Sequence, residues 1–210
     1  MDKNYVITIG REFGSGGLEI GEKLGKILGI KCYDKELINM VAKDNGLDLD
    51  SVVKADEKKA HPLFNPGGHF AFSSSHNDLP AFGTFGNTYN DKMYIAEAEI
   101  IREVAEKESC IIVGRCADAI LRDKNNLLKI FIQAPMTDRI SRTAEKLNIT
   151  PSAAEKEIKR IDKIRSSYYK YYTDDKWGGR LSKDFVINSS YLGIDGTVEF
   201  IKTIVDSRFK

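Results

Sequence analysis

A glycine-rich run near the start of the chain constrains the fold more than any other feature. Residues 10–17 read Gly-Arg-Glu-Phe-Gly-Ser-Gly-Gly, and they follow a short β-branched and aromatic segment at residues 5–9. No regular helix or strand accommodates so many glycines in its interior. After Leu18 the apolar residues recur at helical spacing, and Gly29 provides a helix stop. The first thirty residues therefore predict a strand, a glycine loop and a helix.

Such a loop is suited to phosphate, because it directs several backbone N–H groups to one point at the positive end of the helix dipole. The alternative interpretation is a tight turn that only packs. Counted from Gly10, the lysine and the Ser/Thr of the Walker A pattern fall on Gly16 and Gly17, so both side chains are missing. Arg11 and Ser15 are the candidates to replace them. The residues assigned to phosphate binding are Gly10, Arg11, Gly14, Ser15, Gly16 and Gly17.

Short apolar segments alternate with helical patterns along the rest of the chain. The predicted strands are residues 5–9, 30–33, 110–113, 127–132 and 185–188. The predicted helices are residues 18–28, 35–43, 48–59, 93–107, 136–147 and 151–172, with a closing helix capped by Asp195. Each strand is too apolar to have a wet face, so we expect an α/β fold with a five-stranded parallel sheet covered on both sides by helices.

The composition excludes several classes of protein. The 210 residues predict one domain, and 32 Lys and Arg against 31 Asp and Glu, a net charge of +1, argue against a nucleic-acid scaffold. No window approaches the length of apolar sequence that spans a membrane. The three cysteines have neither disulfide nor zinc spacing, which favours reduced, buried thiols and a cytoplasmic protein.

Three segments together resemble a known family. They are residues 7–21 (ITIGREFGSGGLEIG), 33–38 (YDKELI) and 112–118 (IVGRCAD). They resemble the cytidylate kinase-like family of bacterial proteins, which belongs to the P-loop nucleoside monophosphate kinases. The resemblance covers nearly the whole chain and implies a three-layer P-loop fold, with ATP and Mg²⁺ as cofactors. Authentic cytidylate kinases keep the loop lysine that this chain lacks.

The resemblance also implies an acceptor site. Asp34 matches the aspartate that ends the second strand, near the acceptor nucleotide; its other interpretation is helix capping. Arg115 matches the arginine that contacts the acceptor phosphate, in a motif where Cys116 replaces the family's aspartate. Asp118 lies two residues further on. We therefore expect Asp34, Arg115 and Asp118 to bind the acceptor, and residues 35–90 to form a small acceptor-binding insertion.

Basic residues concentrate between residues 137 and 183. This segment has twelve Lys and Arg against seven Asp and Glu, a local charge of +5 that leaves −4 for the rest of the chain. Positive side chains beside a phosphate site stabilise the charge of phosphoryl transfer. The resemblance implies a lid here, and the predicted catalytic residues are Arg11, Arg139, Arg142, Asp162 and Arg165. The alternative is a solvated helix with ordinary ion pairs.

Two aromatic segments remain. The first favours packing of a helix end over stacking on a base, and it consists of Tyr168, Tyr169, Tyr171 and Tyr172, with Trp177. Residues 61–90 predict a long loop that is unusually rich in Phe, which either folds over the acceptor site or packs against a second subunit in a homo-oligomer. Three histidines there lack the acidic or thiol neighbours of a metal site, so we expect no metal ligands in the chain.

The favoured hypothesis is an ATP- and Mg²⁺-dependent nucleoside monophosphate kinase acting on CMP, dCMP or a similar nucleotide. A second hypothesis is a nucleotide-binding sensor or interaction protein with little or no kinase turnover, which the missing lysine favours. A third is a kinase for a non-nucleotide metabolite on the same scaffold. In each case the expected partner is a small molecule and not a nucleic acid or a membrane.

Overall fold

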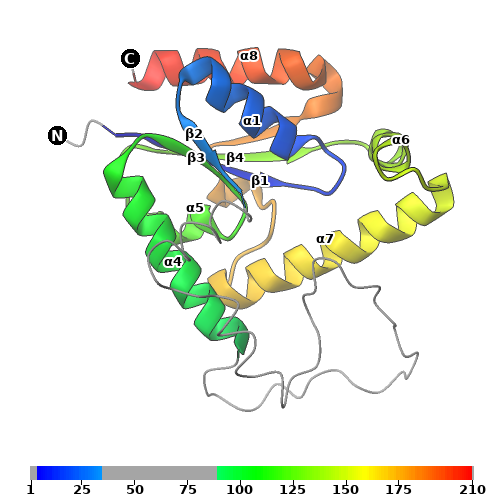
Figure 1. Cartoon of the computed structure of the whole chain (residues 1–210), viewed down its shortest axis with the longest axis horizontal. Coiled ribbons are helices and arrows are strands. Elements are labelled where there is room, and N and C mark those ends of the chain that lie inside the picture. Colours follow the sequence, from blue (N-terminus) through cyan, green and yellow to red (C-terminus); the bar gives the residue numbers. More distant parts are fainter. Residues whose placement is uncertain (1–3, 35–88, 210) are drawn as a thin grey trace.

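The computed structural model describes residues 4–34 and 89–209, and Figure 1 shows the whole chain. Within the described residues, five strands form one parallel sheet in the order β2-β3-β1-β4-β5. The strands are β1 (Val6–Arg11), β2 (Lys31–Tyr33), β3 (Cys110–Val113), β4 (Leu127–Gln133) and β5 (Phe185–Asn188). The predicted α/β fold with a five-stranded parallel sheet is confirmed.

Helices cover both faces of this sheet. The described helices are α1 (Gly17–Leu28), α4 (Tyr89–Lys107), α5 (Ala117–Ile120), α6 (Met136–Leu147), α7 (Pro151–Thr173) and α8 (Ser189–Phe209), with a 3-10 turn η1 (Arg180–Ser182). α1 and α8 lie on one face, and α4 and α5 on the other (Figure 1). In β3, Ile111 and Val113 enter the core beneath α1 and α8, whereas Cys110 and Ile112 enter the core beneath α4. Both faces are buried, which explains why the strand has no polar residue.

α6 and α7 lie beyond the carboxyl ends of the strands and belong to neither core. Thr150 caps α7 by accepting a hydrogen bond from the Ala153 amide at 3.3 Å, and Pro151 occupies the first helical position, as predicted. α7 then runs towards α4 (Figure 1), where Tyr172 stacks on Tyr94 with ring centroids 4.0 Å apart. Tyr168 and Tyr172 thus pack against α4 and not against either core, and Tyr171 is 58% exposed, so the prediction of a packed helix end holds for part of the cluster. The segment predicted as a lid spans α6 and α7.

Two predicted boundaries are wrong. α4 begins at Tyr89, so the predicted loop at residues 61–90 ends before its last two residues. Asp195 does not cap the last helix: α8 is interrupted at Gly193, with φ 70°, and the Asp195 carboxylate accepts a hydrogen bond from Lys23 Nζ at 2.7 Å. The predicted helices at 35–43 and 48–59 and the rest of the predicted loop lie outside the described residues.

The three cysteines are free thiols, as predicted. Cys110 and Cys116 are buried, and Cys32 is partly buried. Burial is the main cause that raises the pKa of each thiol to about 12. Because the thiolate is the reactive form, these cysteines are suited to packing and not to redox chemistry.

Candidate phosphate-binding site

The glycine loop connects the carboxyl end of β1 to the first turn of α1. Gly16 is the N-cap residue of α1 and has φ 83°, and Gly14 has φ 78°. A Cβ on Gly14 would also lie 2.9 Å from the backbone oxygen of Arg139 in α6. Both the left-handed conformation and this close approach require glycine. The loop therefore folds tightly against α6.

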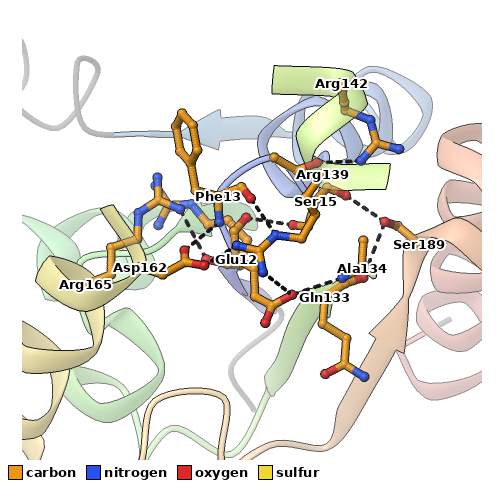
Figure 2. A network of polar contacts seen from close by, with 12 residues as sticks. Glu12, Phe13, Ser15, Gln133, Ala134, Arg139, Arg142, Asp162, Arg165 and Ser189 are labelled. Carbon is orange, nitrogen blue, oxygen red and sulfur yellow. Dashed lines mark hydrogen bonds and ion pairs between the residues drawn. The ribbon is translucent and has the colours of Figure 1, made fainter. Parts of the chain in front are cut away.

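Side chains hold five consecutive carbonyls of this loop (Figure 2). Each bond is supplied by a serine or an arginine of the loop, α6, α7 or α8. The five acceptors and their donors are Arg11 O with Arg165 Nη1 (3.2 Å), Glu12 O with Ser15 Oγ (2.8 Å), Phe13 O with Arg139 Nε (2.8 Å), Gly14 O with Arg142 Nη1 (2.6 Å) and Ser15 O with Ser189 Oγ (2.7 Å). The carbonyl oxygens are thus occupied along the whole loop.

The amides of the loop are used differently. Phe13 N donates to Asp162 Oδ1 at 2.8 Å, and Glu12 N donates to Ile132 O at 3.0 Å. Across residues 4–34 and 89–209, no group accepts a hydrogen bond from the N–H of Gly14, Gly16 or Gly17. These donors lie at the positive end of the α1 dipole, where backbone amides bind anions. The loop is therefore a candidate site for an anion such as a phosphate group.

Arg139 is the centre of the network that holds the loop. Its side chain is 5% exposed, and besides Phe13 O it contacts two carboxylates, Glu12 Oε2 at 3.3 Å and Asp162. Glu12 Oε2 also accepts a hydrogen bond from the Ala134 amide at the end of β4, at 3.1 Å. One guanidinium group thereby joins the loop, α6, α7 and the sheet. The predicted catalytic residues Arg139, Arg142, Asp162 and Arg165 do meet at the loop, where their contacts in this structure fix its backbone.

Arg11 has a different environment from these arginines. Its guanidinium lies against the backbone of Gly114, at the carboxyl end of β3, where any Cβ would overlap it. Burial is the main cause that lowers the pKa of Arg11 to about 9, and the charges of Arg165 and Arg115 lower it further. The Asp34 carboxylate acts in the opposite direction. Within the described residues, the Arg11 guanidinium takes part in no hydrogen bond or ion pair. An anion bound here would relieve the repulsion between these cations.

The predicted acceptor residues are divided between two environments. Asp34 and Arg115 lie close enough to Arg11 for their charges to act on it. Arg115 has φ 56°, in the middle of three successive residues with positive φ, and its side chain pairs with the buried Glu97 at 3.1 Å. Strain of this kind often marks functional sites. Asp118 instead forms an ion pair with Lys183 Nζ at 2.7 Å and accepts a hydrogen bond from Tyr169 Oη at 2.8 Å.

Three polar residues of this region lie outside the predicted set of site residues: Glu12, Glu97 and Ser189. Ser189 directly follows β5, so its place at the carboxyl end of a strand was a usable signal. Glu12 lies inside the glycine loop, but a loop glutamate is usually a solvated side chain. Glu97 has the sequence context of a surface residue in a helix, and only the fold buries it.

Ser189→Ala is expected to lower the free energy of unfolding by about 1–3 kcal/mol, because it leaves the buried Ser15 carbonyl without its side-chain donor. Ser189 is fully buried, and among the described side chains it is the one that donates a hydrogen bond to this carbonyl. Urea unfolding followed by circular dichroism measures the change. The matched control is Ser166→Ala, which removes an exposed hydroxyl in α7 and should change stability by less than about 0.5 kcal/mol. Equal effects from the two substitutions would contradict the role of Ser189.

The described residues do not fit a magnesium ion held by the loop. P-loop enzymes hold this ion with a loop Ser/Thr and a nearby aspartate. Here Gly17 stands in the hydroxyl position, and the Asp118 carboxylate is occupied by Lys183 and Tyr169. No group of three His, Cys, Asp or Glu residues in 4–34 and 89–209 is arranged to hold a metal. In the same ranges, no helix combines the length and apolarity that crossing a membrane requires.

A parallel sheet whose first strand leads into an amide-lined glycine loop defines a P-loop, kinase-like protein. The sequence matches the model of the cytidylate kinase-like family over residues 6–191, and the chain belongs to this family. It is 26% identical over 206 residues to a cytidylate kinase from Thermococcus kodakarensis, covering 96% of this chain and 88% of that protein.

Solved structures have the same fold. An uncharacterized protein from Eubacterium ventriosum is 29% identical, with a TM-score of 0.72, over 98% of this chain and 100% of that one. A shikimate kinase from Acinetobacter baumannii, in complex with shikimate, is 13% identical, with a TM-score of 0.52, over 100% of this chain and 97% of that one. The second likeness establishes the fold alone.

Proposed function

We propose that this chain is an ATP-dependent nucleoside monophosphate kinase that phosphorylates CMP or dCMP. The observation that carries the proposal is the glycine loop, in which side chains hold five successive carbonyls while the amides of Gly14, Gly16 and Gly17 are left for an anion. Membership of the cytidylate kinase-like family and similarity to a cytidylate kinase support a cytidine nucleotide as the acceptor.

In the proposed reaction an acceptor phosphate oxygen attacks the γ-phosphorus of ATP. The bond from this phosphorus to the β–γ bridging oxygen breaks, and ADP leaves with the electron pair. Negative charge on the transferring group is the main demand of this transition state, and donors that are already oriented meet it without reorganisation. The loop amides and Arg11 would supply these donors, with Arg115 and Asp34 assigned to the acceptor nucleotide.

The test is product formation by the purified full-length chain with ATP, magnesium chloride and one monophosphate at a time. We expect CDP from CMP and dCDP from dCMP, formed faster than the diphosphate of AMP, GMP or UMP, with separation of the nucleotides by ion-exchange chromatography. A reaction without acceptor controls for ATP hydrolysis. No diphosphate from any acceptor would defeat the proposal.

A second candidate is a nucleotide-binding protein with little or no turnover. The observation that favours it is the presence of Gly16 and Gly17 where the Walker A pattern has its lysine and hydroxyl. Calorimetric binding of ATP in the absence of any diphosphate product would support it. A CMP-dependent rate that collapses in Arg11→Ala would exclude it.

A further inference from the structure

The two loop positions that carry the Walker A lysine and hydroxyl disfavour a side chain in this fold. A Cβ on Gly16 would overlap Ile194 Cδ1, and Gly16 also has φ 83°. A Cβ on Gly17 would lie 2.5 Å from the Cβ of Arg11. Both atoms in the second contact are fixed to the backbone, so no rotamer change relieves it. Glycine at the hydroxyl position is therefore part of how the loop packs around Arg11, and glycine at the lysine position is part of how it packs against Ile194.

Among the described residues, positive charge exceeds negative charge around Arg11, because Arg165 and Arg115 act on it against the Asp34 carboxylate. No ion pair in the described part of the chain includes Arg11, Arg142 or Arg165, although Asp162 acts on Arg165 at longer range. Arg165 and Arg142 each spend one donor on a loop carbonyl, at different points along the loop (Figure 2). Since a guanidinium group has five N–H donors, most of theirs remain for a ligand.

The carboxylates that the structure describes in this region do not offset this charge. Glu12 and Asp162 pair with Arg139, and Glu97 pairs with Arg115. Asp34 is the carboxylate whose charge acts on Arg11, and the same arginine disfavours a divalent cation at that carboxylate. Among residues 4–34 and 89–209, the groups around the loop are thus rich in arginine and poor in the oxygen ligands that magnesium prefers.

We propose that Arg11, with Arg142 and Arg165, takes the place of both the loop lysine and a loop-held metal ion, so that the site binds the phosphate chain of a di- or triphosphate without magnesium. Guanidinium groups suit this role, since they bind phosphate oxygens through paired, charge-assisted hydrogen bonds. The inference rests on the proposed function only in taking the phosphate chain of a nucleotide as the ligand of the loop. Free inorganic polyphosphate has the same chemistry, and the experiment separates the two.

Isothermal titration calorimetry on the full-length chain tests the inference, with ATP and inorganic tripolyphosphate as ligands, each in EDTA and in excess magnesium. We expect both ligands to bind in EDTA, with the dissociation constant of ATP within about threefold of its value in magnesium. Arg11→Met should weaken both by about 10- to 100-fold, because it removes charge-assisted hydrogen bonds. ATP binding without tripolyphosphate binding would mean that the base, and not the arginines, holds the ligand, and would overturn the inference.

Stability separates a ligand-binding role for Arg11 from a structural one. Arg11 lies partly buried beside like charges, so Arg11→Met should leave the urea midpoint of the ligand-free protein unchanged or raise it. A lowered midpoint with unchanged binding would overturn the inference. Arg11→Lys keeps the positive charge but loses the paired N–H donors of the guanidinium group, so this variant should bind both ligands with intermediate affinity. If Arg11→Met does not fold, Arg11→Lys and Arg165→Met provide the test in its place. Arg122→Met, which removes an exposed arginine, is the control for net charge and should bind like the unmodified chain.

The inference of magnesium-free binding and the proposed kinase activity can each be contradicted without the other. Binding in EDTA without any diphosphate product would support the inference and defeat the proposed kinase activity. Strictly magnesium-dependent binding together with CDP formation would do the reverse.

Discussion

Arg139→Met is expected to lower the free energy of unfolding by about 3–5 kcal/mol, because it leaves two partly buried carboxylates without their counter-charge. These carboxylates are Glu12 and Asp162, and the same substitution removes the donor to the Phe13 carbonyl. The loop amides would lose their orientation, so ATP affinity should fall as well. Urea unfolding and calorimetric ATP titration of the full-length chain measure the two effects.

Arg160→Met is the matched control for this substitution. Arg160 lies in α7 and pairs with Glu157 three residues earlier, on an exposed face of the helix. Pairs of this kind contribute about 0.5 kcal/mol or less, so stability and ATP affinity should hardly change. Similar losses from Arg139→Met and Arg160→Met would contradict the central role given to Arg139.

Restoring the Walker A residues with the double substitution Gly16→Lys and Gly17→Ser is expected to weaken ATP binding at least tenfold, about 1.4 kcal/mol, and not to improve it. Lysine at position 16 would adopt a left-handed conformation that costs about 1–2 kcal/mol. Serine at position 17 would press its Cβ against that of Arg11 and displace the arginine from the site. ATP titration and urea unfolding measure the result.

Gly29→Lys controls for the backbone strain alone. Gly29 ends α1 with φ 68°, and a Cβ there would meet nothing within 4 Å. This substitution should therefore lower stability without changing ATP affinity. Tighter ATP binding by the double variant would mean that the loop tolerates the Walker A residues and that Arg11 is not their replacement.

Local sequence patterns predicted the parts of this protein that depend on neighbouring residues. The alternation of apolar strands and helices gave the sheet, and the glycines after the first strand gave the loop, because strand pleat, helix period and positive φ are properties of short segments. The i, i+3 spacing of Arg139 and Arg142 placed them on one face of a helix, and both do reach the loop. Most of the predicted acceptor-binding insertion at 35–90 lies outside the described residues, so it stays a prediction.

Contacts between distant residues decided what the arginines do. Arg139 lies 126 residues from the Phe13 carbonyl to which it donates, and Ser189 lies 174 residues from the Ser15 carbonyl. No sequence pattern specifies such pairs, since they exist only where α6, α7 and α8 pack around the carboxyl ends of the strands. The sequence by itself determined a glycine loop that lacks the Walker A lysine. Only the tertiary structure assigned Arg139 to holding that loop and left Arg11 without an ion-pair partner among the described residues, because burial and the packing of Gly17 and Gly114 against Arg11 arise from the whole fold.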